Sequence, residues 1–442
     1  MGSFATPLSG LTAAQGQLQS VSNNLANLNT DGYKDQTLTF ADVFSQTGIT
    51  NGSGDPVQTG SGVTVSSTDA DFTEGTLTAT GTSSNMALSG NGFFVAQSSS
   101  GLPDFTRAGD FTTNNDGQIT TPSGELLLGY PAVNGVVNTA TTLQPLQVGT
   151  GVTSPAVAST TLNISANLNA SSVVGDTASS TLPIFDSLGA SHTLSVTYTM
   201  TAPNTWGYSV TIPTADLAPA PAAPVLPNTT VASGTLNFSS SGVLTSTEPT
   251  GGTATVAPSA GIALTIPPVF PPVAPAAGVQ STLADGAGAM TGLTWSLVTA
   301  GTPTITQTAT ASSTSATSTN GFASGTLTTY AVQPDGTIEG TFNSGQTLAL
   351  GQVAVASFSN TQGLVDVGNN NYQPSAASGA AVIGVAGTGG RGTVIGGSVE
   401  ESNVNIATEF AKLIVAQQAY SANAKSITTF NQVSQATIAM LQ

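Results

Sequence analysis

Apolar residues recur at helical spacing in two stretches of the chain, one near each end. In the first stretch the steps between apolar positions are 3, 4, 3, 4 and 3 residues, which is the pattern of a heptad seam. Thr6 and Pro7 predict an N-cap and a first-turn proline, and the run Asn-Thr-Asp-Gly at 29–32 predicts the end of the helix. The seam consists of Leu11, Ala14, Leu18, Val21, Leu25 and Leu28.

The C-terminal stretch repeats the steps of 4 and 3 residues and predicts a second, longer helix. Asn403 or Asn405 is its predicted N-cap. Beyond the seam, Phe430, Val433 and Met440 extend an apolar face. The seam positions are Ile406, Phe410, Leu413, Gln417, Tyr420, Ala424 and Ile427.

The long middle of the chain, from about residue 36 to 398, has the two-residue period of β-strands, as in the runs at 194–200 and 206–210. Three times an aromatic residue is followed by polar residues, a glycine and then Ile or Leu. This pattern predicts hairpin turns at Gly117, Gly242 and Gly336.

Three stretches of biased composition lie within the middle third. Pro-rich sequence occupies 213–227 and 267–276, and Ser/Thr-rich sequence occupies 308–320. We expect all three to be exposed loops.

The predicted fold class is mixed and mainly β. Long N- and C-terminal α-helices are expected to form a coiled-coil-like core domain, with two or more β-rich, barrel- or sandwich-like outer domains inserted between them. The expected parts are a terminal helical core (1–32 and 403–442), a connecting segment (33–87 and 390–402), a first β-rich domain (88–146 and 326–389) and an outer β-rich region (147–325).

Charged residues are scarce in this chain of 442 residues. Five basic and 22 acidic residues give a net charge of −17, and cysteine is absent. Such an acidic surface excludes nucleic acid as a partner, and no apolar window is long enough to predict membrane insertion. The first residues lack the basic and apolar regions of a cleaved signal peptide, so export by another route is expected.

The first 30 residues carry no charged side chain. The face opposite the leucine seam is therefore uncharged and polar, and an isolated helix of this kind is only marginally stable. Close packing of many identical copies suits such a face, because it avoids repeated contacts between like charges. The pattern favours self-association.

The alternative is an intramolecular coiled coil between the two terminal helices. It would leave Phe430, Val433 and Met440 without an intramolecular partner, because the second helix is much longer than the first. Each of these side chains would forfeit roughly 1.5–3 kcal/mol if it stayed in water. Burial shared between subunits therefore explains the pattern better.

Several segments resemble flagellar rod, hook and hook-associated proteins. SNNLANLNTDGYK at 22–34 resembles their N-terminal signature, and the segment 402–430 resembles their shared C-terminal element. LSGNGFFVA at 88–96 and TRAGDFTTNNDGQI at 106–119 are similar to their first globular domain. The signature positions are Ser22, Asn23, Asn24, Leu25, Asn27, Gly32, Tyr33, Lys34, Ser402, Asn403, Glu409, Gln417, Tyr420 and Asn423.

The segment at 182–198, LPIFDSLGASHTLSVTY, resembles the outer domain of the hook members and so favours a hook subunit over a rod subunit. The resemblance implies a short curved tube that acts as a universal joint and transmits motor torque from rod to filament. It also implies as partners other copies of the chain, the distal rod protein, the hook cap protein, the hook-filament junction protein and the flagellar type III export apparatus. The implied location is extracellular, on the distal side of the basal body.

Candidate chemistry is weak, and we predict no catalytic, cofactor or metal site. His192 lies near Asp186, Ser187 and Ser191, but these residues flank one predicted hairpin and are expected to be polar turn residues. GTGGRG at 387–392 fits a dinucleotide motif, yet no helix opens after it, which predicts a flexible linker. Oxygen-bearing residues that are expected in turns and lack a calcium-loop spacing are Asp69, Asp71, Asn115 and Asp116.

Other functions remain open on the sequence alone. Within the same class, the chain could be a distal rod or hook-filament junction protein. A secreted β-rich adhesin or surface-layer protein explains the composition but not the two heptad ends. An extracellular hydrolase would depend on His192.

Overall fold

The computed structural model describes residues 4–50, 56–149, 151–218, 227–250, 256–266 and 282–440. The chain divides into two compact units. Unit 1 comprises Met1–Val152, Thr329–Thr341 and Thr347–Gln442, and unit 2 comprises Thr153–Thr328 and Phe342–Gln346. Each unit is described by itself.

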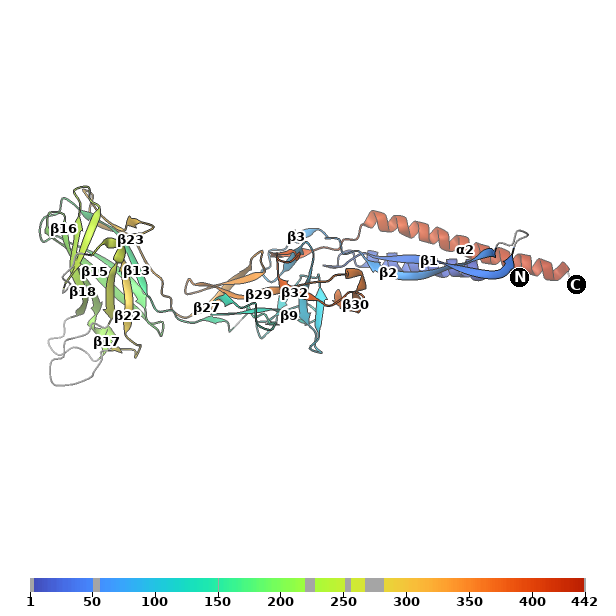
Figure 1. The fold of residues 1–442 in the computed structure, drawn as a ribbon, viewed down its shortest axis with the longest axis horizontal. Coiled ribbons are helices and arrows are strands. Elements are labelled where there is room, and N and C mark those ends of the chain that lie inside the picture. The colour runs from blue at the N-terminus through green and yellow to red at the C-terminus, as the bar shows by residue number, and fades with distance from the viewer. Residues whose placement is uncertain are drawn as a thin grey trace. The chain divides into compact units, whose positions relative to one another are not determined.

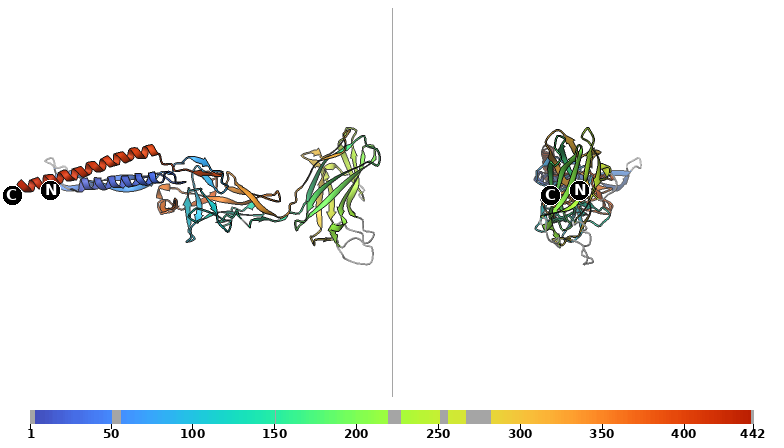
Figure 2. Two further views of the ribbon diagram at one scale, coloured as in Figure 1. Left: turned by 180° about the vertical axis from the view of Figure 1, so that it is seen from behind. Right: turned by 90° about the vertical axis from the view of Figure 1, so that its left-hand side faces the viewer.

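The terminal part of unit 1 consists of two helices and one long hairpin. Helix α1 (Ala5–Ala26) and helix α2 (Ile406–Met440) lie antiparallel, and strands β1 (Gln36–Thr50) and β2 (Pro56–Ala70) run beside them (Figures 1 and 2). The aromatic rings of Phe4 and Phe430 lie 6.0 Å apart. On the hairpin side, the Ser20 hydroxyl donates to the carbonyl of Gln36 at 2.7 Å. Helix α1 is therefore covered by α2 and by strands.

The predicted fold class is wrong. Among the described residues, helix accounts for about 17% and strand for about 48%, and the ends do not form a coiled-coil-like core of two long helices. Much of the α2 seam is exposed, including Ile406 at 47% and Phe410 at 51%, while the hairpin packs on α1. A heptad pattern identifies the apolar positions of a helix but not the element that packs on them. For α1 part of that element is the hairpin β1–β2, which the pattern does not predict.

The N-termini of the two helices are capped differently. Helix α1 begins at Ala5 after Phe4, which makes no side-chain cap, so the prediction of Thr6 as N-cap is wrong. At α2, the side-chain oxygen of Asn405 accepts from the backbone nitrogens of Ala407 at 3.0 Å and Thr408 at 3.1 Å, which confirms the predicted cap.

Phe430 was expected to lack an intramolecular partner, and this is wrong because it contacts Phe4. Val433 and Met440 are 58% and 84% exposed. Large apolar side chains of α2 are thus left exposed along its whole length, from Ile406 to Met440.

The rest of unit 1 is a β-rich region whose main sheet has the neighbour order β27-β28-β29-β9-β5-β6-β31-β30. Two apolar clusters fill it, one around Phe94 and Phe111 and one around Phe93 and Phe105. Its strands are β3 (Leu77–Ala79), β4 (Met86–Ser89), β5 (Phe93–Gln97), β6 (Pro103–Thr106), β7 (Thr112–Thr113), β8 (Ile119–Thr120), β9 (Leu126–Val133), β10 (Val136–Val137), β11 (Gln144–Pro145), β27 (Gly325–Val332), β28 (Thr337–Phe342), β29 (Thr347–Ser357), β30 (Val365–Gly368), β31 (Asn371–Gln373), β32 (Val382–Val385), β33 (Thr393–Gly396) and β34 (Ser398–Glu400), with the 3-10 turn η3 (Thr361–Gly363).

Unit 2 contains two five-stranded sheets whose inner faces share one apolar core. One sheet has the order β20-β22-β13-β25 with β26 beside β13, and the other has the order β14-β15-β16-β18-β19. The elements are β12 (Thr153–Ser154), β13 (Thr161–Asn169), β14 (Thr177–Phe185), β15 (Ser191–Ala202), β16 (Thr205–Pro213), η1 (Thr214–Asp216), β17 (Leu217–Ala218), β18 (Asn228–Phe238), β19 (Leu244–Pro249), η2 (Pro258–Ala260), β20 (Ile262–Ile266), β21 (Thr282–Leu283), β22 (Met290–Ser296), β23 (Val298–Thr299), β24 (Thr302–Pro303), β25 (Ile305–Thr308) and β26 (Ser313–Thr319).

The strand period and the hairpin turns are confirmed. The apolar residues of the runs at 194–200 and 206–210 are buried in unit 2. Gly117, Gly242 and Gly336 each have a positive φ, between 76° and 83°, and each closes a turn by donating to a carbonyl three residues earlier. A left-handed backbone of this kind favours glycine.

The Ser/Thr-rich stretch at 308–320 was expected to be a loop, and this is wrong. Residues 313–319 form β26, which pairs antiparallel with β13 while its side chains stay mostly exposed. Thr is β-branched and suits a strand with one face in water. The Pro-rich stretch at 267–276 lies outside the described residues, as does 219–226 of the stretch at 213–227.

We predict that Trp295→Ala destabilises unit 2 by about 3–5 kcal/mol, the usual cost of truncating a buried aromatic side chain. The Trp295 side chain is fully buried, and its ring lies 5.6 Å from that of Tyr208. The chain has two tryptophans, so urea unfolding followed by the fluorescence of Trp206 measures the change. Val173→Ala, at a site 68% exposed, is the control and should change stability by less than about 0.5 kcal/mol.

Candidate functional site

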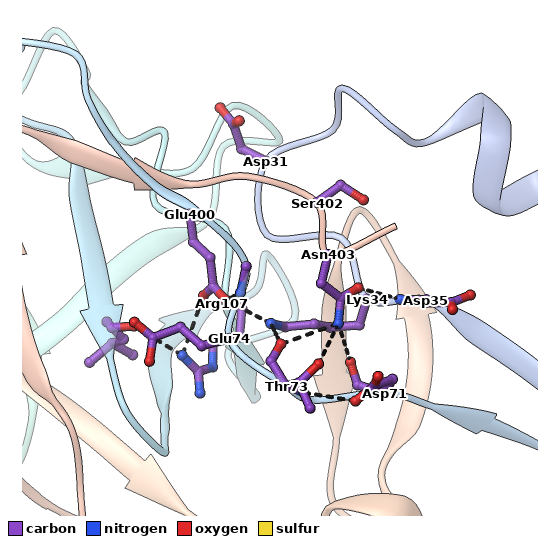
Figure 3. A network of polar contacts seen from close by, with 12 residues as sticks. Asp31, Lys34, Asp35, Asp71, Thr73, Glu74, Arg107, Glu400, Ser402 and Asn403 are labelled. Carbon is purple, nitrogen blue, oxygen red and sulfur yellow. Dashed lines mark hydrogen bonds and ion pairs between the residues drawn. The ribbon is translucent and has the colours of Figure 1, made fainter. Parts of the chain in front are cut away.

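A buried carboxylate, Glu400, joins three distant segments of unit 1 (Figure 3). Its Oε1 lies 2.6 Å from Nζ of Lys34, and its Oε2 lies 3.3 Å from Nη1 of Arg107. Oε1 also accepts from the backbone nitrogen of Gly75 at 2.8 Å. Lys34 follows α1, Arg107 follows β6 and Glu400 ends β34, so one side chain ties together the start, the β region and the end of the chain.

Both cations at Glu400 are almost fully buried and have further partners. Lys34 donates to the carbonyl of Thr73 at 2.7 Å, and Arg107 donates to the carbonyls of Leu88 at 3.2 Å and Gly90 at 2.6 Å. Burial lowers the pKa of Lys34 and of Arg107, and the charge of Glu400 partly opposes this effect. Removing one partner of such a cluster leaves an uncompensated buried charge.

The turn before Lys34 requires a glycine. Gly32 has a φ of +71°, and its nitrogen donates to the carbonyl of Glu400 at 2.7 Å. A Cβ at this position would lie 2.4 Å from the nitrogen of Ala108. The backbone of this turn therefore approaches two other segments closely enough to exclude any side chain.

Asn403 binds the same region from the start of the C-terminal segment (Figure 3). Its side-chain oxygen accepts from the nitrogen of Asp35 at 2.8 Å, and its amide group donates to the carbonyls of Asp71 at 2.8 Å and Thr73 at 3.2 Å. Asn403, which precedes α2, is thereby hydrogen-bonded to the two segments that flank the hairpin β1–β2: Asp35 before β1, and Asp71 and Thr73 after β2.

Asn24 forms a second buried polar centre, between α1 and α2. Its amide group donates to the carboxylate of Glu409 at 3.1 Å and to the carbonyl of Gln36 at 3.0 Å, and it also bonds Asp35. Its oxygen accepts from the hydroxyl of Tyr33 at 3.1 Å. Burial raises the pKa of Tyr33 to about 12, so this hydroxyl stays a donor at neutral pH.

Lys412 lies at the edge of this second centre. Its Nζ is 2.6 Å from Oε1 of Glu409 and 3.5 Å from Oδ2 of Asp35. Burial alone would lower the pKa of Lys412, but the hydrogen bond to Glu409 and the nearby carboxylates raise it. Burial raises the pKa of Asp35 despite the opposing charge of Lys412.

The structure brings together five of the signature residues: Asn24, Tyr33, Lys34, Asn403 and Glu409. The remaining signature residues lie around this group or away from it. Gly32 shapes the turn, Asn23 donates to Tyr33, Asn27 bonds Asn23, Ser402 accepts from the nitrogen of Val404, Leu25 is half-buried, Asn423 faces Gly10, and Ser22, Gln417 and Tyr420 are exposed.

The predicted packing residues divide by helix. On α1, Ala14 and Val21 are buried, and Leu11, Leu18, Leu25 and Leu28 are half-buried. On α2, Leu413 and Ile427 are half-buried, whereas Ile406, Phe410 and Tyr420 are exposed.

Two central residues, Arg107 and Glu400, were missing from the predicted site. The scarcity of positive charge was a usable signal, because the whole chain has five basic residues. Three of them, Lys34, Arg107 and Lys412, form ion pairs here. Arg107 also lies in the segment 106–119, and Glu400 lies two residues before the C-terminal signature.

The expectation that His192 is a polar turn residue is wrong. It lies on β15, is 6% exposed and contacts Asp186. Ser187 and Ser191 are exposed, and in the described part of the chain neither hydroxyl bonds the imidazole, so no nucleophile is aligned. Burial alone would raise the pKa of Asp186, but hydrogen bonds to its carboxylate, including those from the backbone nitrogens of Leu188 and Ala190, hold it below its usual value.

The segment GTGGRG at 387–392 is not a linker into the helix. It forms the turn between β32 and β33, where the nitrogen of Gly387 donates to the carbonyl of Gly392 at 2.8 Å. Of the acidic residues expected in turns, Asp69 lies instead on strand β2 and accepts from the hydroxyl of Ser67 at 3.2 Å. Asp71 accepts from the nitrogen of Thr73 at 2.9 Å, and Asp116 is exposed.

Four family models match successive parts of the chain. They are described as flagella basal body rod protein (residues 4–34), flagellar hook protein FlgE/F/G D1 domain (87–171), flagellar basal body protein FlaE D2 domain (153–322) and flagellar basal body rod FlgEFG protein C-terminal (395–440). The Glu400 network thus draws on residues inside three of the matched regions.

Similar proteins match over nearly the whole length. The flagellar hook protein FlgE of Salmonella typhimurium is 32% identical over 98% of this chain and 98% of its own, and that of Treponema pallidum is 31% identical over 97% of each. The crystal structure of Helicobacter pylori flagellar hook protein FlgE2 covers 72% of this chain and 98% of its own, with 15% identity and a TM-score of 0.46.

These matches define a class, the structural proteins of the flagellar rod and hook. Within that class the chain belongs to the flagellar hook protein FlgE family. Its role is that of a structural subunit of the bacterial flagellar hook. In the described part of the chain, neither helix combines the length and the apolar character that crossing a membrane would need.

We predict that Glu400→Gln destabilises the terminal part of unit 1 by about 3–5 kcal/mol, because Lys34 and Arg107 would stay buried with a neutral partner. Hydrogen exchange of the α1 and α2 amides measures the effect. The matched control is Glu401→Gln, since Glu401 is exposed and accepts from Thr78 at 2.8 Å, which an amide oxygen can also do. Equal protection in the two variants would contradict a central role for Glu400.

Proposed function

We propose that the subunit polymerises through its terminal elements into a short curved tube, which acts as a universal joint and transmits motor torque from rod to filament. The observation that carries this proposal is the large apolar surface that α2 leaves exposed. Its large exposed side chains are Ile406, Phe410, Ile414, Val415, Tyr420, Phe430, Val433, Ile438 and Met440, each between 39% and 84% exposed. Burial of each against another copy stabilises the assembly by roughly 1.5–3 kcal/mol at most.

Charge supports a second copy as the occupant of this face. Helix α2 carries three charged residues, Glu409, Lys412 and Lys425, and the first two are paired within the subunit. The first 30 residues carry none. Identical helices can then pack side by side without repeating a like-charge contact at each interface.

The later turns of α2 offer a hollow for a neighbouring side chain. It is lined by Ala422, Lys425, Ser426, Thr429, Phe430 and Val433. Under the proposal, the exposed and half-buried seam residues of both helices and the exposed signature residues Gln417 and Tyr420 contact neighbouring copies in an inner tube.

Torque transmission needs a stiff connection between that tube and the β-rich parts. The Glu400 network suits this role, because it joins the segments that leave α1 and enter α2 to the β region through buried, charge-assisted hydrogen bonds. The proposed layers are residues 1–32 and 403–442 as inner tube, 33–87 and 390–402 as connection, 88–146 and 326–389 as first β-rich domain, and 147–325 as outer layer.

The proposed partners follow from a position between rod and filament. They are the distal rod protein at one end, the hook cap protein and the hook-filament junction protein at the other, and the flagellar type III export apparatus during secretion. The proposed location is outside the cell on the distal side of the basal body.

The subunit is proposed to have no enzymatic activity. The family is one of structural proteins, and the exposed serines beside His192 support this view because they do not bond the imidazole in the described structure. A distal rod or junction role is less well supported, because the relatives that match over the full length are hook proteins.

We predict that the full chain forms tubes visible by electron microscopy, whereas a chain that lacks residues 1–30 and 403–442 stays monomeric. Tryptophan fluorescence is the folding control, since both tryptophans lie in unit 2. Tubes formed by the truncated chain would refute assembly through the terminal elements.

We also predict that Val415→Asp abolishes tube formation and leaves the isolated subunit folded. Val415 is 60% exposed, so a charge there is harmless in water but becomes buried and unpaired between copies. Thr408→Asp adds the same charge to an exposed site in the first turn of α2, where the helix dipole favours it. This control should still assemble, as judged by sedimentation of polymer.

A further inference from the structure

The one histidine of the chain lies in unit 2 among three aspartates. Its Nε2 is 3.2 Å from Oδ2 of Asp186 and 3.8 Å from Oδ2 of Asp285, and its Nδ1 is 3.2 Å from Oδ2 of Asp216. The imidazole and Asp186 are buried, and the side chains of Asp216 and Asp285 are 27% and 29% exposed. A hook subunit does not need this cluster for any role derived above.

Backbone hydrogen bonds orient the carboxylates of Asp186 and Asp285 toward Nε2 of His192. Oδ1 of Asp186 accepts from the nitrogens of Leu188 and Ala190, both at 2.9 Å. Oδ1 of Asp285 accepts from the nitrogen of Ala287 at 3.0 Å. The second oxygen of each carboxylate is therefore held toward Nε2 of His192 by the fold itself.

The other side of the ring is also fixed. When the ring proton is on Nδ1, it faces Oδ2 of Asp216 at 3.2 Å, and a carboxylate in such a place can orient a metal-binding histidine. In that tautomer the lone pair of Nε2 points at two carboxylate oxygens, so three acceptors face one another. Such an arrangement is repulsive unless a cation lies between them.

A proton on Nε2 satisfies this arrangement only in part. It can bond Asp186 at 3.2 Å, but the 3.8 Å separation from Asp285 exceeds hydrogen-bond length. A metal ion can bond all three atoms at once, and the three ligand atoms lie within 4.8 Å of one another. A tetrahedral zinc ion with bonds of about 2.0–2.2 Å sets its ligand atoms about 3.3–3.6 Å apart.

We propose that His192, Asp186 and Asp285 bind one divalent transition-metal ion of the Zn²⁺ type, with Asp216 as a positioning residue. Imidazole together with carboxylates selects such ions over Ca²⁺, which prefers an all-oxygen shell. The partly exposed side of Asp285 provides the path of entry. The ion links the turn after β14, strand β15 and the segment after β21, so its effect is to hold these three parts of unit 2 together.

The test uses the full chain as subunit, stripped with a chelator and titrated with Zn²⁺ or Ca²⁺ by calorimetry. We expect one Zn²⁺ per chain, a rise in the thermal midpoint of unit 2 and no comparable effect of Ca²⁺. His192→Gln and Asp285→Asn should each weaken Zn²⁺ binding at least tenfold. Asp216→Asn should weaken it about 10–100-fold, as for other residues that orient a metal ligand.

Asp116→Asn is the matched control, because it makes the same chemical change at an exposed turn. It should bind Zn²⁺ as the unmodified chain does. Circular dichroism checks that each variant is folded, and the partly exposed Asp285 offers a variant that does not disturb the core. The proposal is overturned if the stripped chain binds no Zn²⁺, or if Asp285→Asn and His192→Gln bind it unchanged. It is also overturned if acidification alone reproduces the stabilisation and Zn²⁺ adds nothing, since a proton would then be the cation.

Discussion

The placement of Glu400 between Lys34 and Arg107 constrains most of unit 1. A carboxylate with no exposure to water is costly unless it is paired, and here two buried cations and a backbone nitrogen surround it. The turn at Gly32, the path of residues 71–75 and the direction in which the chain enters α2 all follow from that requirement. The helices and the hairpin can vary in what they contact, but these three segments cannot separate without exposing or orphaning a charge.

The same network explains how the chain uses its few positive charges. Three of the five basic side chains are paired at the junction between the terminal elements and the β region. The helices are left with almost no net charge of their own, which suits contacts between identical copies. Specific ionic contacts are therefore made within a subunit, and apolar and uncharged polar surfaces remain for contacts between subunits. This division separates the stability of the subunit from the adaptability of the assembly.

Sequence patterns revealed local structure better than partners in space. The positive-φ glycines at 117, 242 and 336 and the alternating run at 194–200 could be read directly, because turn and strand preferences act over a few residues. The packing of strands β1 and β2 on α1 could not be predicted, because these strands lie in a Gly- and Thr-rich segment whose composition resembles that of a linker. The Ser/Thr-rich strand β26 was missed for the same reason. Glu400 and His192 were missed or misjudged because burial depends on segments hundreds or tens of residues away.

The distance along the chain between the two halves of the Glu400 network has a consequence for the order of events. Lys34 and Glu400 are 366 positions apart, and closing so long a loop in an unstructured chain costs on the order of 5 kcal/mol of entropy. Folding of the intervening β-rich regions shortens the effective loop and removes most of that cost. The terminal elements are therefore the last part of the subunit to fold. The surface through which copies associate forms only after the β-rich regions have folded, which limits premature association of newly made chains.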